Sequence, residues 1–213
     1  MALHIKFTRA LGIKIVLCIL GNIIIGIGAA FTKMALFGND PFNGMALSVA
    51  AFLHIPYVAY VYALNLILFV FEWIWGRKYI NIGSFINMLL MSVVVDFFIP
   101  VFEGLVGYPD SMIFRVLILL GGMIITSFGL ALYQEANLGV APYDAVPLMV
   151  VDHFPKVKFF WARIALDSLS ALLILLTGGI LGIGTLANAL CLGPFVHIFT
   201  LMIRGKAKEA TAG

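Results

Sequence analysis

Asp144 is the residue of this sequence best placed to do chemistry. It ends the stretch Leu-Gly-Val-Ala-Pro-Tyr-Asp, which begins at Leu138, and an apolar run follows it directly. A helix that starts at Pro142 leaves several backbone N–H groups unpaired, and its dipole adds partial positive charge at that end. A carboxylate there can bind a cation or carry a proton. Alternatively, it only caps its own helix.

A matching stretch lies 101 residues earlier in the chain. It reads Phe-Gly-Asn-Asp-Pro-Phe-Asn, from Phe37 to Asn43, so Pro41 corresponds to Pro142 and Asn43 to Asp144. Two polar, helix-breaking stretches in corresponding halves of an apolar chain are typical of the binding site of a membrane transporter. We therefore expect a substrate or ion site where these two stretches meet.

Further polar residues extend this candidate site. Asn87 and Asn188 lie about two turns into the apolar runs in which they occur, where they could face the half-helix ends or join neighbouring helices. The two alternatives stay open. The candidate residues for binding a solute or an ion are Asp40, Pro41, Asn43, Asn87, Pro142, Tyr143, Asp144, Thr185 and Asn188.

The composition excludes a soluble domain. Apolar residues make up 63% of the chain and charged residues 11%, against about 45–50% and about 25% in soluble proteins. The lipid bilayer is therefore the first expected partner. The basic residues form no stripe of the kind that binds nucleic acid, so no nucleic-acid partner is expected. Cys18 and Cys191 both lie in apolar runs, which argues against a disulfide framework.

Six apolar runs are long enough to cross a bilayer, which needs about 20 residues per helix. They cover residues 11–33, 57–76, 80–101, 112–134, 158–177 and 180–203. Two shorter runs, 41–54 and 142–153, each begin with a proline and are followed by a second proline. We interpret them as half-helices that enter the membrane and return to the same face. The alternative is eight short spans.

The two halves of the chain carry the same pattern in the same register. Gly21 and Gly28 recur 101 residues later as Gly122 and Gly129, and their spacing of seven places both small residues on one helix face. We predict an all-α polytopic membrane protein made of two repeats, residues 1–106 and 107–213. Each repeat has three transmembrane helices and one re-entrant half-helix. An odd number of crossings per repeat makes the repeat inverted.

The basic residues predict the orientation. With three spans per repeat, Arg77, Lys78, Lys156 and Lys158 gather on one side with both ends of the chain, whereas Lys33 and Arg115 are the basic residues of the other side. Positive loops stay in the cytoplasm. We therefore expect a protein of the cell membrane with cytoplasmic N- and C-termini.

Three other charged residues in apolar runs have structural interpretations. Arg163 and Asp167 lie four residues apart on one helix face, so a structural ion pair is favoured over a gate. Glu72 lies beside Trp73 near the end of a predicted span, where tryptophan typically marks the membrane interface. We expect Glu72 to be interfacial as well.

Two blocks resemble a known family. Glu135 to Asp144, Glu-Ala-Asn-Leu-Gly-Val-Ala-Pro-Tyr-Asp, and Leu181 to Phe195, which begins Leu-Gly-Ile-Gly-Thr, are similar to signatures of the YczE/YitT-type bacterial integral membrane proteins. The resemblance covers nearly the whole chain and is weaker in the first half, where Asn43 replaces an aspartate. It implies a multi-pass membrane protein but no substrate. The asparagine argues against a mechanism with two equivalent carboxylates.

These features favour a small transporter or channel for an unidentified solute or ion, with its site between the two half-helix N-termini near the midplane. No metal-ligand spacing, phosphate-binding glycine loop or nucleophile–base pair occurs, so neither an enzyme nor a cofactor is expected. The alternatives are an accessory or assembly membrane protein and a substrate-binding subunit of a larger importer. A homo-oligomer is also considered.

Overall fold

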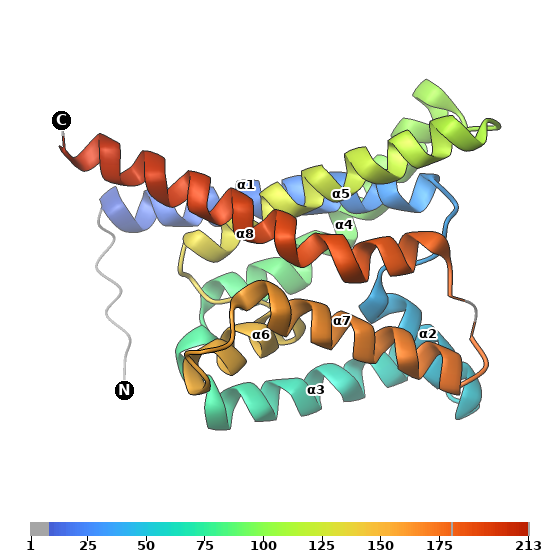
Figure 1. Cartoon of the computed structure of the whole chain (residues 1–213), viewed down its shortest axis with the longest axis horizontal. Helices are drawn as coiled ribbons and strands as arrows, with labels where there is room; N and C mark the ends of the chain where they lie inside the picture. The colour runs from blue at the N-terminus through green and yellow to red at the C-terminus, as the bar shows by residue number, and fades with distance from the viewer. Residues whose placement is uncertain (1–8, 180, 213) are drawn as a thin grey trace.

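The computed structural model describes residues 9–179 and 181–212, so the remaining residues of the two predicted repeats lie outside the described part. The described chain is all-α, as predicted (Figure 1). Its elements are α1 (Arg9–Met34), α2 (Pro41–Phe52), α3 (Tyr57–Trp75), the short 3₁₀ helix η1 (Arg77–Tyr79), α4 (Ile82–Val106), α5 (Met112–Glu135), α6 (Pro142–His153), α7 (Phe159–Leu176) and α8 (Ile183–Ala212).

Five helices in the described part are long and apolar enough to cross a membrane, namely α1, α4, α5, α7 and α8. They match five of the six predicted spans. The sixth prediction, 57–76, corresponds to α3, whose described apolar stretch Ala59–Trp75 is slightly shorter. Large apolar side chains such as Leu66, Leu89 and Ile113 are exposed on these helices. Such a surface is suited to lipid and not to water.

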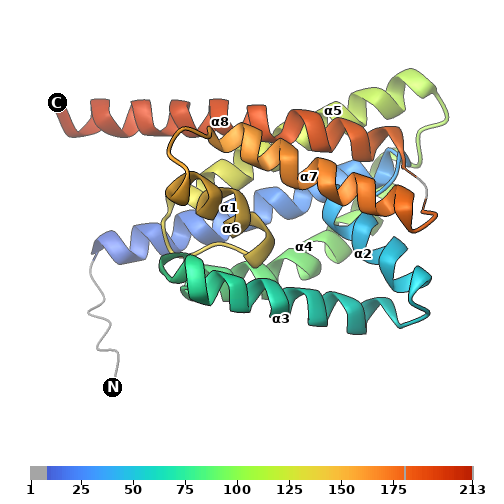
Figure 2. The ribbon, with the colours of Figure 1, turned by 60° about the horizontal axis from the view of Figure 1, so that its bottom comes forward.

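The two shorter helices, α2 and α6, have 12 residues each. At 1.5 Å per residue each is about 18 Å long, which is less than the hydrocarbon core of about 30 Å. They lie at opposite ends of the molecule (Figures 1 and 2). Pro41 and Pro142 begin them, as predicted. Before each helix a glycine with positive φ, Gly38 or Gly139, turns the chain back.

The glycines predicted to share a face form the contact between α1 and α5. A Cβ built on Gly122 would lie 2.8 Å from the carbonyl oxygen of Gly28, and one built on Gly129 would lie 2.8 Å from that of Gly21. No side chain fits in that space, so the two backbones touch. The predicted role of these glycines in packing is confirmed.

The two halves of the chain are interleaved. The N-terminal end of α1 and the C-terminal end of α8 lie at the same end of the molecule (Figure 1). Helix α4 packs on α1 and α8 packs on α5, while α2 packs on α7 and α6 packs on α3. The half-helices therefore each bind a long helix from the other half, which brings their N-terminal ends into the middle of the molecule.

Candidate functional site

Asp144 lies in the first turn of α6 and binds two partners from neighbouring helices. Its Oδ1 is 2.6 Å from Nη1 of Arg163 on α7, and its Oδ2 accepts a hydrogen bond of 2.8 Å from the Tyr133 hydroxyl on α5. The N-cap of α6 is Ala141, and no side chain makes a cap hydrogen bond there. The interpretation of Asp144 as a simple helix cap is therefore wrong.

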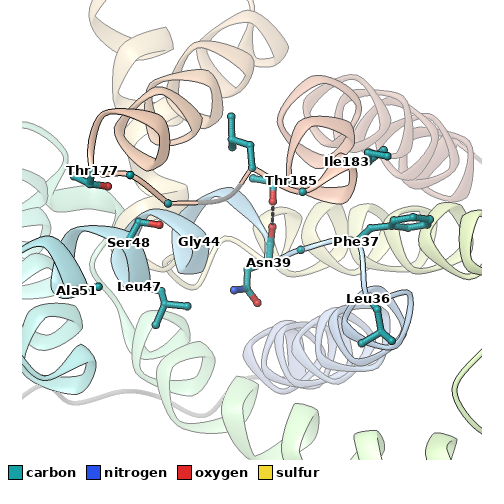
Figure 3. Close-up of a pocket in the computed structure, with 15 residues that line it drawn as sticks. Leu36, Phe37, Asn39, Gly44, Leu47, Ser48, Ala51, Thr177, Ile183 and Thr185 are labelled. Carbon is teal, nitrogen blue, oxygen red and sulfur yellow. Dashed lines mark hydrogen bonds between the residues drawn. The ribbon is translucent and has the colours of Figure 1, made fainter.

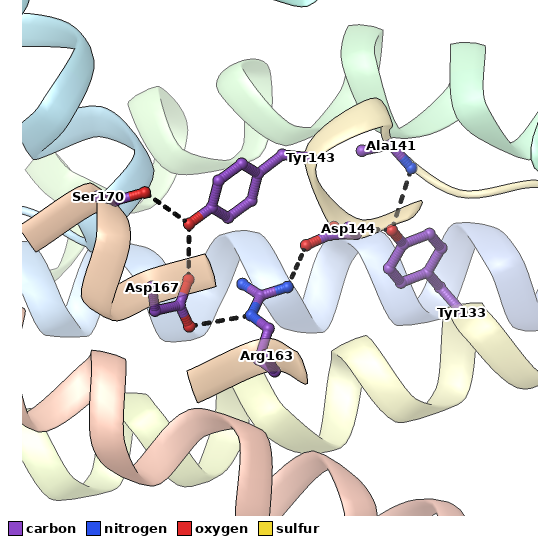
Figure 4. Close-up of polar contacts among 7 residues, drawn as sticks. All are labelled: Tyr133, Ala141, Tyr143, Asp144, Arg163, Asp167 and Ser170. Atoms are coloured by element: carbon purple, nitrogen blue, oxygen red, sulfur yellow. Dashed lines mark hydrogen bonds and ion pairs between the residues drawn. The ribbon is translucent and has the colours of Figure 1, made fainter. Parts of the chain in front are cut away.

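The guanidinium of Arg163 joins Asp144 to a second carboxylate. Its Nε lies 3.0 Å from Oδ2 of Asp167, which confirms the predicted ion pair on α7. Asp167 also accepts a hydrogen bond of 2.7 Å from the Tyr143 hydroxyl, which lies 3.1 Å from Oγ of Ser170. One network thus connects α5, α6 and α7 (Figure 4).

Most of this network is buried, and the Asp144 side chain is 14% exposed. Arg163 is 5% exposed and Asp167 is fully buried. A buried arginine between two carboxylates is held by charge-assisted hydrogen bonds. Loss of one carboxylate or of the arginine would leave a buried charge unpaired. Spacing along α7 predicted one of the two ion pairs. The contacts of Arg163 and Tyr133 with Asp144 join residues on different helices, and no spacing rule could reveal them.

The corresponding position in the first half is built differently. Asp40 is the N-cap of α2 and accepts hydrogen bonds from the backbone N–H of Asn43 at 3.0 Å and from its side-chain Nδ2 at 2.7 Å. The Tyr57 hydroxyl donates to Oδ1 of Asn43 at 2.8 Å. Asn43 therefore belongs to a separate cluster at α2, apart from the Asp144 network.

The two half-helices nevertheless touch at their N-terminal ends. The rings of Phe42 and Tyr143, which correspond at the offset of 101 residues, have centroids 4.8 Å apart. Pro41 and Pro142 are both buried beside them. The contact at the second residue of each half-helix brings together the two predicted stretches, although the polar residues that follow them point to different partners.

The remaining predicted residues divide between packing and the path to α2. Asn87 donates a hydrogen bond to Asn22 and so ties α4 to α1, and Asn188 donates to the carbonyl of Gly184 within α8 at 3.0 Å. The Asn87 contact favours the packing alternative, whereas the Asn188 contact lies within one helix and supports neither alternative. Thr185 donates to the Asn39 carbonyl at 2.6 Å and so holds the segment that leads into α2.

An open cavity of about 670 Å³ lies at the α2 end of the molecule. Its walls come from residues 36–39, from α2, from the segment after α7 and from the start of α8 (Figure 3). Asn39, Ser48, Thr177 and Thr185 supply side-chain polar groups to this wall, and small residues such as Gly44 leave the space open. Phe37, Gly38 and Asn39 of the first predicted stretch line this cavity together with the predicted Thr185, but no sequence pattern predicted the other walls.

At the opposite end, side chains lock α6 to the segment after α3. The Tyr79 hydroxyl donates to Asp152 at 2.6 Å, and Lys78 pairs with the same carboxylate at 2.7 Å. Met149 packs directly on Gly76. We call Lys78, Tyr79, Met149 and Asp152 the α6 latch. Burial raises the pKa of Asp152, but the hydrogen bonds from Lys78 and Tyr79 outweigh burial, so the pKa lies below the usual value of an aspartate.

Glu72 requires a correction. The prediction placed it at the membrane interface, but its side chain is fully buried, and neither carboxylate oxygen has a hydrogen-bond partner. It lies within electrostatic range of Asp144. The neighbouring Trp73 is exposed, as an interfacial residue should be. Adjacent residues on a helix point about 100° apart, so the exposure of Trp73 does not predict the exposure of Glu72.

The long apolar helices and the lipid-suited surface define a multi-pass membrane protein. The chain belongs to the family described as a family of unknown function (DUF6198), which matches residues 12–201. It is similar to the uncharacterized membrane protein YczE of Bacillus subtilis, with 24% identity over 81% of this chain and 79% of the relative. The predicted resemblance to YczE is therefore confirmed.

Two further relatives support the same placement. The uncharacterized protein YyaS of Bacillus subtilis is 21% identical over 84% of this chain and 89% of its own length. An uncharacterized protein of Haemophilus influenzae is 25% identical over 84% of this chain and 80% of its own length. No solved structure matches the chain.

Proposed function

We propose that this protein is a carrier for a small solute in the cell membrane, and not an enzyme. The observation that carries the proposal is the meeting of two half-helices from opposite ends of the molecule, at Phe42 and Tyr143, beside the largely buried Asp144–Arg163 pair. Ionisable groups held inside a membrane protein, next to broken helices, characteristically mark solute or ion paths.

An inverted repeat, which we propose here, would fit this assignment. Helices α2 and α6 have the same length, and their bounds differ by 101 residues, as do the repeated glycines. Under a twofold relation the first repeated glycine of α1, Gly21, must meet the second repeated glycine of α5, Gly129. The built Cβ positions place Gly21 against Gly129 and Gly28 against Gly122, as this relation requires. The repeats would comprise residues 1–106 and 107–213, with both termini in the cytoplasm by the positive-inside rule.

The difference between the two ends favours a carrier over a channel. Ser48 and Thr177 line the open cavity, and the residues at the corresponding positions, Met149 and Gly76, pack together at the α6 latch. One pathway is therefore open and its counterpart is closed. In an inverted repeat, the first half can adopt the closed conformation while the second half adopts the open one. The site would then open to the other side of the membrane.

The cavity wall indicates the class of solute. Its polar side chains are hydroxyls and one amide, and within the described residues no charged side chain lines it. The charges of Arg163, Asp144 and Asp167 are already engaged with one another. A wall of this kind suits a neutral small molecule that combines hydroxyl or amide groups with an apolar part.

The proposal is tested by flux into proteoliposomes with a panel of radiolabelled neutral polyols, amides and zwitterions, with anions and cations as comparison groups. We expect the reconstituted protein to accumulate or exchange at least one neutral solute above protein-free liposomes. Asp144→Asn should reduce that flux at least tenfold, because it removes the charge that holds Arg163 against α6. Asp96→Asn, an exposed carboxylate on α4, is the control and should be silent.

Flux of no solute in the panel, or equal flux in wild-type protein and Asp144→Asn, would contradict the proposal. An accessory role would then be the better assignment, because Asp144 would serve packing alone.

A further inference from the structure

Glu72 is a buried carboxylate without a hydrogen-bond partner. Its charge state therefore determines the cost of burying the end of α3 against α6. Its side chain is fully buried in the last turn of α3, and both oxygens lack hydrogen bonds. An ionised carboxylate that is buried and unpaired costs several kcal/mol within a membrane protein. Glu72 must therefore be neutralised by a neighbouring cation, by a bound metal ion or by a proton.

Among the described residues packed around α3, no cation pairs with Glu72. On α6, Asp144 acts on Glu72 with a charge of the same sign, and Asp152 is bound by Lys78 and Tyr79. His153 lies against the Trp75 ring and its Nδ1 donates a hydrogen bond to the Met149 carbonyl, so it does not pair with Glu72. Helix α2 contains no ionisable residue, and Asp96 of α4 is exposed. The two basic residues of η1 and the arginine of the network have other contacts: Arg77 stacks on Trp73, Lys78 pairs with Asp152, and Arg163 is shared by Asp144 and Asp167.

A metal ion does not fit either. Hard cations are bound by several oxygen ligands at once. Neither oxygen of Glu72 has a hydrogen-bond partner, and the described residues contain no group of three or more His, Cys, Asp or Glu side chains that could hold a metal ion. A proton needs a single oxygen, and the nearby negative charge of Asp144 favours the protonated acid over the carboxylate.

We propose that Glu72 is the proton-binding residue of this protein and couples proton movement to the opening of the α6 latch. Glu72 takes up one proton to form a neutral carboxylic acid, which the closed α3–α6 contact can bury. When the latch opens, water reaches the end of α3 and the acid releases its proton there. This coupling depends on the proposed carrier function, whereas the protonation of Glu72 itself does not.

Infrared spectroscopy of the purified protein in lipid tests the protonation directly. We expect a carbonyl stretching band of a protonated carboxylic acid at neutral pH, absent from Glu72→Gln and retained in Glu103→Gln, whose carboxylate is exposed on α4. Glu72→Gln should fold, because a neutral amide replaces a neutral acid of the same shape. Identical bands in wild-type protein and Glu72→Gln would show an ionised Glu72 and overturn the proposal.

Proteoliposome transport tests the coupling. We expect an imposed pH gradient to raise wild-type uptake at least tenfold, and Glu72→Gln to lose this response while still exchanging solute at equal pH. Replacement of Na⁺ by K⁺ should change nothing. A Glu72→Gln protein that still responds to the pH gradient, or wild-type uptake that requires Na⁺, would overturn the coupling. Absence of any wild-type flux would instead count against the carrier function, and the infrared result would stand.

Discussion

Arg163 lies between two carboxylates that belong to different helices. Asp167 is on its own helix, one turn away, and Asp144 is on the half-helix α6. Because the Arg163 guanidinium binds both carboxylates, a small movement of α6 would separate Asp144 from Arg163 and leave a largely buried charge unpaired. At the scale of the residue, the network therefore fixes α6 against α7 and makes its displacement a discrete event.

Arg163→Gln should be strongly destabilising. It leaves Asp144 and Asp167 without their shared cation, and breaking a buried pair in this way costs about 3–5 kcal/mol. Arg204→Gln is the matched control, since Arg204 is largely exposed and pairs with Glu135 at the surface, where such a pair contributes about 1 kcal/mol or less. Thermal unfolding in detergent measures both. A midpoint for Arg163→Gln as high as that of Arg204→Gln would show that the network does not hold α6.

Residue spacing revealed part of this site. The pairing of Arg163 with Asp167 and the place of Asp144 in the first turn of a half-helix follow from the sequence, because both depend on neighbours along one helix. The partners of Asp144 on α5 and α7 and the burial of Glu72 depend on how helices rotate against one another. A single apolar chain does not specify that rotation, since lipid and protein interiors favour the same residue types.

At the scale of the element, the contact between α1 and α5 depends on glycine. Positions Gly28 and Gly122 let the two backbones touch where any larger residue would separate them. These glycines, the prolines that begin α2 and α6, and the helix bounds were predictable, because they are local features repeated in one register. The cavity was not, because its wall combines segments from both halves.

Gly122→Leu should lower the yield of folded protein and its thermal midpoint, because the side chain would meet the backbone of α1. Overpacking of this kind costs about 1–3 kcal/mol or more. Gly121→Leu is the matched control, because a Cβ built on Gly121 has no atom within 4 Å. Size-exclusion yield and thermal unfolding check the pair. Equal behaviour of the two variants would mean that α1 and α5 do not cross at these glycines.

At the scale of the whole molecule, the cavity beside α2 and the latch beside α6 lie at opposite ends (Figures 1 and 2). A carrier needs these ends to face opposite sides of the membrane. Eight short spans would instead put the far ends of both half-helices on the same side. The two arrangements therefore make different predictions for the residues that end α2 and α6.

Thiol labelling from each side of the membrane distinguishes them most directly. Leu53 and Phe154 are the exposed C-cap residues of α2 and α6 and correspond at the offset of 101 residues. Each is replaced by cysteine in a background in which Cys18 and Cys191 are alanine, and an impermeant maleimide is applied to intact cells and to inverted vesicles. We predict that Leu53→Cys reacts only from outside and Phe154→Cys only from the cytoplasmic side. Labelling of both positions from the same side would contradict the opposed half-helices and the carrier built on them.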